Sequence, residues 1–178
     1  MTADSPTAES AIIVPVDLPI AMRRLRDRMD PLAAQGVPAH VTLLYPFAPP
    51  ATLDAGSRAR VARTIASESA FSFVLARVER WPGVVYLRPE PGEPFDRLIR
   101  ALAAAFPDYP PYGGAHAVAD IMAHVTIAQS DRADYLDAAA HALPAFLPVR
   151  AVCREAWLIA HRPAEHWRTV WKLPLAGG

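Results

Sequence analysis

The sequence predicts a mixed fold of strands and helices, built from a duplicated βαββ-like unit that forms two similar lobes around a cleft. Three observations lead to this prediction. The tetrapeptide Ala-His-Val-Thr occurs twice, at residues 39–42 and 123–126. Each copy is followed by a helical segment and then by a strand that begins near Phe71 or near Phe146. A hairpin follows each of these strands, so the two halves repeat one order of elements.

The first half of the chain alternates short apolar runs with amphipathic segments. Apolar residues at helical spacing indicate helices, and short alternating or continuous apolar runs indicate strands. Proline and glycine mark the turns between them. In chain order, the sequence predicts a strand at 11–16, a helix at 20–29, a strand at 40–47, a helix from a Thr52 cap to about Ser69, and a hairpin of strands at 71–76 and 84–88.

The second half contains the clearest amphipathic helix of the chain. Apolar residues recur at helical spacing from Phe95 to Phe106, and Pro107 ends the pattern. The proline- and glycine-rich residues 107–115 predict a loop ahead of the second tetrapeptide. The remaining predicted elements are a strand at 121–129, a helix from a Ser130 cap to about Leu143, and strands near 146–152, 157–161 and 167–173.

Length and composition favour one globular domain. The 178 residues, 52% apolar and 20% charged, exclude a wholly disordered chain. Residues 1–10 are small and polar, so we expect them to be disordered, and residues 11–178 to form one domain of two pseudo-symmetric lobes. A formal net charge of zero argues against binding of long DNA, and it restricts any anion site to a local pocket.

Cysteine usage and apolar runs indicate the compartment. Cys153 is the only cysteine, which excludes an internal disulfide and a cysteine-based zinc site, and its apolar surroundings favour a core position. No apolar run is long enough to span a membrane, and an aspartate and prolines interrupt the first run, unlike a signal peptide. We therefore expect a cytoplasmic protein with no membrane partner, and we expect it to be a monomer.

The repeated tetrapeptide suggests a chemistry. Residues i and i+2 of a strand share one face, so His40 lies beside Thr42 and His124 beside Thr126. Two imidazoles around one phosphorus can act as base and acid, because a pKa near ~6.5 lets one ring be neutral and the other protonated. The hydroxyls can donate to non-bridging phosphate oxygens. The competing interpretation is that both copies are core strand segments of a duplicated fold.

These motifs resemble those of the 2H phosphoesterase superfamily, and within it the bacterial 2′-5′ RNA ligase and cyclic phosphodiesterase group. The resemblance rests on residues 38–47, on residues 123–127 and on the Pro-Pro-Tyr-Gly-Gly loop at 110–114. It implies a bilobal α+β fold with two antiparallel sheets, outer helices and a central cleft. It also implies hydrolysis of a 2′,3′-cyclic phosphate, typically to a 2′-phosphate, or reversible 2′-5′ ligation of RNA ends.

The resemblance also implies roles for individual residues. His40 and His124 correspond to the acid/base pair, and Thr42 and Thr126 to the phosphate-binding donors. Some RNA-ligating relatives carry arginine a few residues after the second motif, where this chain has Gln129. This difference favours a smaller substrate than long RNA.

We therefore predict a metal-independent phosphodiesterase that acts on a 2′,3′-cyclic phosphate or a 2′-5′ phosphodiester of a nucleotide or RNA end. The sequence has no His-x-x-x-His pattern and no histidine/aspartate cluster, so no metal or other cofactor is expected. Two alternatives stay open: a 2′-5′ RNA ligase that runs the reverse reaction, and a nucleotide- or RNA-binding module with little catalysis. Intact histidines and threonines in both motifs favour the enzyme.

Three aromatic residues are candidates for stacking on a base. Tyr45 and Phe47 follow the first motif, but strict alternation puts them on the face of Val41, which favours core packing unless Pro46 breaks the alternation. Tyr112 lies in the glycine-rich loop and is a candidate for stacking or for a lid. Arg88 and Arg132 are weaker candidates for phosphate contacts. The other histidines, His116, His141, His161 and His166, are interpreted as surface or structural residues. The tryptophans Trp157, Trp167 and Trp171 fit strand core, and the arginines of the helix at 20–29 fit a solvated face.

Overall fold

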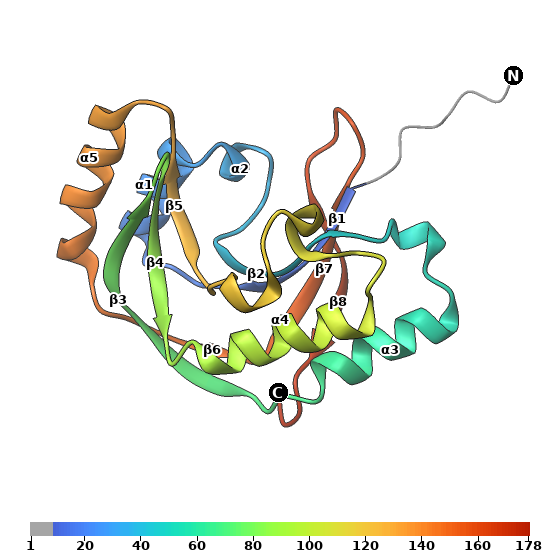
Figure 1. Ribbon diagram of the computed structural model, residues 1–178. Coiled ribbons are helices and arrows are strands. Elements are labelled where there is room, and N and C mark those ends of the chain that lie inside the picture. Colours follow the sequence, from blue (N-terminus) through green and yellow to red (C-terminus); the bar gives the residue numbers. More distant parts are fainter. Residues whose placement is uncertain (1–8) are drawn as a thin grey trace, which may run out of the picture.

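The computed structural model describes residues 9–178, which form one eight-stranded antiparallel sheet with helices packed against it (Figure 1). The strand order is β6-β3-β4-β5-β2-β1-β7-β8, so the predicted α+β class is confirmed. The strands are β1 Glu9–Pro15, β2 His40–Phe47, β3 Phe71–Trp81, β4 Val84–Glu90, β5 Val125–Gln129, β6 Val149–Cys153, β7 Glu155–His161 and β8 Arg168–Pro174.

Helices and short 3-10 segments connect these strands. The amphipathic patterns predicted α1 and α4 within two residues at each end. The helices are α1 Ile20–Met29, α2 Pro31–Ala34, α3 Ala55–Ile65, α4 Glu93–Ala105 and α5 Ala133–Ala142, and the 3-10 segments are η1 Pro50–Thr52, η2 Pro111–Gly114, η3 Val118–Asp120 and η4 Leu143–Phe146.

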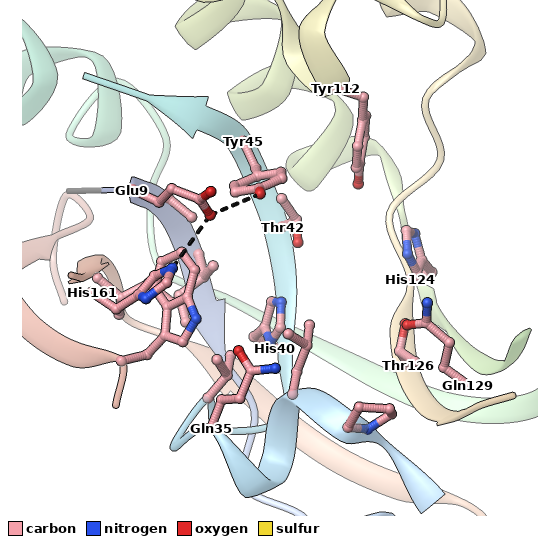
Figure 2. A pocket seen from close by; sticks show the side chains of 17 residues that line it. Glu9, Gln35, His40, Thr42, Tyr45, Tyr112, His124, Thr126, Gln129 and His161 are labelled. Carbon is pink, nitrogen blue, oxygen red and sulfur yellow. Dashed lines mark hydrogen bonds and ion pairs between the residues drawn. The ribbon is translucent and has the colours of Figure 1, made fainter. Parts of the chain in front are cut away.

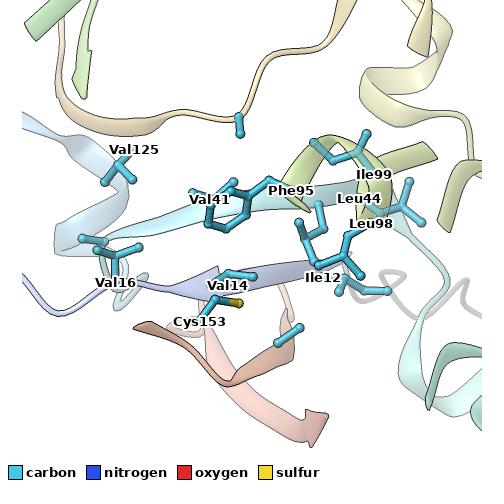
Figure 3. Close-up of a cluster of buried hydrophobic side chains, with 14 of the residues drawn as sticks. Ile12, Val14, Val16, Val41, Leu44, Phe95, Leu98, Ile99, Val125 and Cys153 are labelled. Carbon is cyan, nitrogen blue, oxygen red and sulfur yellow. The ribbon is translucent and has the colours of Figure 1, made fainter. Parts of the chain in front are cut away.

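The apolar face of α4 fills much of the core beside β1 and β2 (Figure 3). Phe95, Leu98 and Ile99 of this face are at most 1% exposed. They belong to one buried cluster with Ile12 of β1 and Leu44 of β2. Burial of each such side chain contributes about 1.5–3 kcal/mol, so α4 holds the strand that carries the first His-x-Thr motif.

The sheet is continuous, whereas the sequence predicted two sheets. β2 and β5 are neighbours at its centre, joined by the register pair Val41–Val125. β3 and β4 from the first half of the chain pair with β6 and β5 from the second half, and β7 from the second half pairs with β1. Each group of four neighbouring strands therefore contains strands from both halves of the chain. The pairing of β5 with β2 joins the two groups, β6-β3-β4-β5 and β2-β1-β7-β8, into one sheet.

The predicted β3–β4 hairpin is confirmed, and β7 and β8 form the hairpin predicted in the second half, but the strand before it does not begin at Phe146. That residue lies in η4, and β6 begins only at Val149, because Pro148 has no amide hydrogen for the ladder. β6 pairs with β3 at one edge of the sheet, and β7 and β8 form a hairpin at the opposite edge.

Two predicted helix caps are wrong. The N-cap of α3 is Asp54, whose carboxylate accepts a hydrogen bond from the Ser57 amide at 2.7 Å. Thr52 belongs to η1, where its hydroxyl donates to a carbonyl oxygen. Ser130 precedes α5 by a turn and accepts from the amide of Arg132, which is the N-cap residue. A carboxylate at a helix start also interacts favourably with the helix dipole, which favours Asp54 over Thr52.

Two strand starts also differ from the prediction. β5 begins at Val125, not at Ile121, because residues 121–124, which follow the 3-10 turn η3, pair with neither β4 nor β2. His124 therefore lies one residue before the strand that carries Thr126. β1 begins at Glu9, so two of the residues expected to be disordered are part of the sheet, and residues 1–8 lie outside the described part of the chain.

Candidate functional site

Both His-x-Thr copies face one cavity of about 610 Å³ (Figure 2). His40 and Thr42 reach it from β2, Thr126 from β5, and His124 from the residue before β5. The central position of β2 and β5 in the sheet brings the two copies together. The fold thus places the four motif side chains around a single space.

The two imidazoles are held in the same way. His40 Nδ1 lies 2.8 Å from the Pro38 carbonyl oxygen, and His124 Nδ1 lies 2.9 Å from the Met122 carbonyl oxygen. A carbonyl oxygen accepts hydrogen bonds and cannot donate, so each Nδ1 carries the hydrogen. Nε2 of each neutral ring is therefore the acceptor nitrogen, the form required of a general base.

Both imidazoles are more readily deprotonated than an ordinary histidine. Burial lowers the pKa of His40 to about 4, with smaller contributions in the same direction from Arg26 and His124. Burial also lowers the pKa of His124. Both shifts favour the neutral ring in the free protein, and an anion bound beside the rings would favour the protonated form.

Arg26 of α1 is buried, in contrast to the prediction of a solvated arginine face. Its guanidinium forms an ion pair with Asp30 at 2.6 Å, and the whole residue is 2% exposed. It also donates to the carbonyl oxygens of Val37 at 2.9 Å and Thr126 at 3.3 Å. Arg26 therefore ties α1 to the backbone of both segments that flank the cavity.

A break in the alternation of β2 decides the position of Tyr45. Against β1, the register shifts after the Thr42–Ile13 pair and again after the Leu44–Ile12 pair. Each shift adds a residue to β2, as in a β-bulge, so side chains beyond it change face. Tyr45 therefore lines the cavity with Thr42, and its hydroxyl donates to the Glu9 carboxylate at 3.2 Å.

Phe47 is not a stacking residue of the cavity. It is 3% exposed, and its ring packs edge-on against Phe106 and Tyr109 at centroid distances of 5.1 and 5.3 Å. Only the core interpretation of Phe47 is therefore supported, as strict alternation from Val41 favoured.

Tyr112 forms part of the cavity wall from the loop ahead of the second motif. Its backbone is left-handed, with φ of 53°, a conformation that is unusual for a residue with a side chain. Burial raises the pKa of its phenol, and a hydrogen bond with Thr42 acts in the opposite direction. Tyr112, which the sequence predicted as a stacking or lid residue, thus lies over the first motif, with its hydroxyl near Thr42 (Figure 2).

A second cavity of about 480 Å³ lies on the other side of His124 and Tyr112, which line both spaces. Trp81 lines the second cavity, and its ring meets the His124 ring edge-on at a centroid distance of 4.6 Å. The centroid of the Tyr86 ring lies 5.6 Å from the centroid of the same imidazole. These aromatic contacts contribute to the burial of His124.

Several other candidates lie elsewhere. The Arg88 guanidinium lies 3.9 Å from the Glu79 carboxylate, and the Arg132 guanidinium forms an ion pair with the Asp134 carboxylate at 2.5 Å. Neither arginine lines the main cavity, whereas Gln129 does. Burial raises the pKa of the Cys153 thiol to about 12, in agreement with a core role.

Sequence reasoning missed part of the cavity wall. Glu9, Gln35, His161 and Trp167 line it, although His161 was interpreted as a surface or structural residue and Trp167 as a core residue. They come from β1, the end of α2, the end of β7 and the turn before β8. None of them belongs to a motif, so the sequence carried no signal for their assembly.

The described residues, 9–178, contain neither a candidate metal site nor a candidate transmembrane helix. No group of three or more histidine, cysteine, aspartate or glutamate side chains in that range is arranged to hold a metal ion. None of the helices in that range is long and apolar enough to cross a membrane.

An antiparallel sheet whose two central strands present His-x-Thr motifs to one cavity defines the class of two-histidine phosphoesterases. Residues 14–165 match the model of the 2′-5′ RNA ligase superfamily, and the chain belongs to this superfamily. The resemblance inferred from the two motifs is therefore confirmed at the level of the family.

Solved structures with the same fold cover nearly the whole chain. Apo LigT of E. coli has a TM-score of 0.57 and 15% identity, covering 97% of this chain and 99% of LigT. TT0787 of Thermus thermophilus has a TM-score of 0.58 and 19% identity, covering 93% and 97% of the two chains. A protein described as a phosphoesterase has a TM-score of 0.56 and 17% identity, covering 96% of this chain and 99% of its own. No curated protein sequence matches the chain.

Proposed function

We propose that this protein is a phosphodiesterase that hydrolyses a 2′,3′-cyclic phosphate or a 2′-5′ phosphodiester of a nucleotide or RNA end, without a metal ion. The observation that carries the proposal is the matched pair of imidazoles. Each has its Nδ1 hydrogen bonded to a backbone carbonyl, and both line one cavity with a threonine beside them. Together these side chains supply a proton acceptor, a proton donor and two hydroxyl donors.

The reaction begins when the phosphate binds between the motifs. Hydroxyl groups of Thr42 and Thr126 donate to the non-bridging oxygens, where negative charge increases in the transition state. The phosphate anion raises the pKa of the adjacent histidines, which burial holds low in the free protein. One ring can then carry a proton while the other stays neutral.

Hydrolysis needs two proton transfers. Nε2 of the neutral histidine takes a proton from water as the water oxygen forms a bond to phosphorus. The bond between phosphorus and the leaving ribose oxygen breaks, and the protonated histidine gives its proton to that oxygen. Proton exchange between solvent and the two rings restores the starting state.

A small substrate suits the cavity. A volume of about 610 Å³ is within the range of ordinary small-molecule sites. E. coli LigT has been crystallised with 3′-AMP, with NADP+ and with ATP, which supports a nucleotide as the ligand of this related fold. Gln129 adds no positive charge to the wall, which favours a nucleotide or a short RNA end over long RNA.

The test is a substrate screen in the presence of EDTA. Purified protein is incubated with the four nucleoside 2′,3′-cyclic phosphates and with 2′-5′ dinucleotides, and products are separated by chromatography. We expect turnover to a 2′-phosphate that survives chelation and is lost in the His40→Ala and His124→Ala variants. Absence of turnover on all of these substrates, or full activity of either variant, would contradict the proposal.

A 2′-5′ RNA ligase is the second candidate, and the second cavity favours it. The ligation product, like a 2′-5′ phosphodiester substrate and unlike a mononucleotide cyclic phosphate, has a nucleoside on each side of the phosphate, and the 480 Å³ space beyond His124 and Tyr112 offers room for the second one. Incubation of an RNA with a 2′,3′-cyclic phosphate end and an RNA with a free 5′-hydroxyl tests it directly. Formation of a longer product with a 2′-5′ linkage would identify the ligase.

A further inference from the structure

Glu9 places a carboxylate at the edge of the main cavity and is not one of the groups used in the proposed reaction. Its Oε2 accepts a hydrogen bond from Tyr45 at 3.2 Å and lies 3.3 Å from Nε2 of His161 (Figure 2). Both contacts use the same oxygen, and within residues 9–178 no hydrogen bond to Oε1 is found. The Glu9 side chain is 55% exposed, so Oε1 can be reached by a ligand.

This carboxylate contributes little to the fold. An exposed ion pair is a weak contribution to stability, because water solvates both partners. β1 is held by its pairing with β2 and β7 and by buried residues such as Ile12 and Ile13. The position of Glu9 is therefore better explained by contact with a ligand in the cavity than by a role in stability.

The wall beside Glu9 is aromatic. The rings of His161 and Trp167 are tilted by 39° at a centroid distance of 4.4 Å, and Tyr45 lies 6.5 Å from Trp167. Trp167 Nε1 is buried and has no acceptor among the described residues, and the Gln35 amide lines the same cavity. An aromatic wall with an acceptor at its edge and N–H donors nearby is suited to a nucleobase.

The four bases present different edges to a carboxylate. Guanine has two adjacent donors, N1–H and the N2 amino group, which match the two oxygens of a carboxylate. Adenine and cytosine place an amino group beside a ring nitrogen that is an acceptor and repels an anion. Uracil has one N–H between two carbonyl oxygens. A carboxylate that reads the Watson–Crick edge therefore distinguishes guanine from the other three.

We propose that Glu9 is a specificity-determining residue that selects a guanine base in the substrate. The proposal rests on the proposed function for the position of the phosphate between the histidines. The base is then expected against the wall of Tyr45, His161 and Trp167, with its N1 and N2 donors on the Glu9 carboxylate.

Binding of non-reactive nucleotides tests this assignment separately from catalysis. Dissociation constants of 2′-GMP, 2′-AMP, 2′-CMP and 2′-UMP are measured by calorimetry for the native protein and for Glu9→Gln. We expect 2′-GMP to bind about tenfold to a hundredfold more tightly than the others, the usual discrimination of a bidentate base contact. Glu9→Gln should remove this preference and leave the other three affinities unchanged, since an amide offers a donor where guanine needs an acceptor.

The matched control is Glu155→Gln, which changes a strand glutamate that does not line the cavity and instead contacts Trp157 and Lys172. It should keep the full preference for 2′-GMP. Equal binding of the four nucleotides, preference for another base, or a guanine preference that survives Glu9→Gln would overturn the inference. Guanine selectivity that depends on Glu9, without hydrolysis of any cyclic phosphate, would support it and reject the proposed function alone.

Discussion

Val41 and Val125 face each other as the register pair that joins β2 to β5 at the centre of the sheet. Because the two strands are antiparallel, His40 lies across from Thr126 and Thr42 lies across from His124. Each valine is buried on one face, and its two neighbours in the motif point to the opposite face, toward the cavity. One buried pair of valines thus sets the position of all four polar side chains.

This arrangement predicts a strong effect of removing either imidazole. His40→Ala and His124→Ala should each lower the rate by about 10² to 10⁴, the usual contribution of a positioned acid or base. The double variant should lose much less than the product of the two effects, because the histidines act as a unit. Thr42→Ala and Thr126→Ala should lower the rate less than the histidine variants do, since each removes one neutral hydrogen-bond donor. Steady-state rates with circular dichroism as the folding control would measure these differences.

The lowered histidine pKa values predict an acid-shifted pH profile. The free protein needs one neutral and one protonated ring, so kcat/KM should be bell-shaped, with both limbs below the ordinary histidine pKa of ~6.5. Bound phosphate stabilises the protonated ring, so the basic limb of kcat should lie at higher pH than that of kcat/KM. Coincident basic limbs would show that the substrate does not act on these imidazoles.

Burial of His40 also predicts a loss of stability in acid. Its folded pKa, about 4, is below its unfolded value, so the unfolded state binds more protons between pH ~6.5 and 4. Stability should therefore fall as pH decreases through this window, by roughly 1–3 kcal/mol from this residue. Urea unfolding at about pH 7 and about pH 4.5 should show a smaller decrease in His40→Asn than in the native protein. His141→Asn, at an exposed position on α5, is the control and should behave like the native protein.

The buried Arg26–Asp30 pair predicts a coupled effect on stability and on His40. Arg26→Met leaves Asp30 buried without its partner and should cost about 3–5 kcal/mol. The double variant Arg26→Met with Asp30→Asn should be less destabilised than the sum of the single variants. Because the Arg26 cation lowers the pKa of His40, that pKa should rise when the cation is removed. Chemical denaturation and NMR titration of the His40 ring measure the two effects, and an unchanged His40 titration would exclude the electrostatic link.

The left-handed backbone of Tyr112 allows its side chain to be tested with little cost to the fold. Glycine adopts φ near 53° without strain, so relief of backbone strain offsets part of the lost ring contacts, and Tyr112→Gly should cost only about 1 kcal/mol of stability. The loss of the cavity wall should raise KM for a cyclic phosphate severalfold. Tyr112→Phe keeps the ring and should retain most of the binding. A normal KM in Tyr112→Gly would show that the substrate does not contact this side of the cavity.

Local sequence determined most elements and the four motif residues. Helix α4 and the β3–β4 hairpin follow from periodicity and turn residues, which are properties of neighbouring positions. The repeated Ala-His-Val-Thr identified the side chains of the cavity, because a strand forces its alternate residues onto one face. The family also followed from these motifs.

Tertiary structure decided the features that depend on residues distant in the chain. The bulged pairing of β2 with β1 moves Tyr45 to the cavity, and neither strand encodes that shift alone. The burial of Arg26 depends on Asp30 and on two backbone carbonyls, one of them 100 residues away. The continuous sheet arises because β5 from the second half of the chain pairs on one side with β4 and on the other with β2, both from the first half. Strand partners and buried charges are selected by the free energy of the whole packed structure, so local sequence patterns do not contain them.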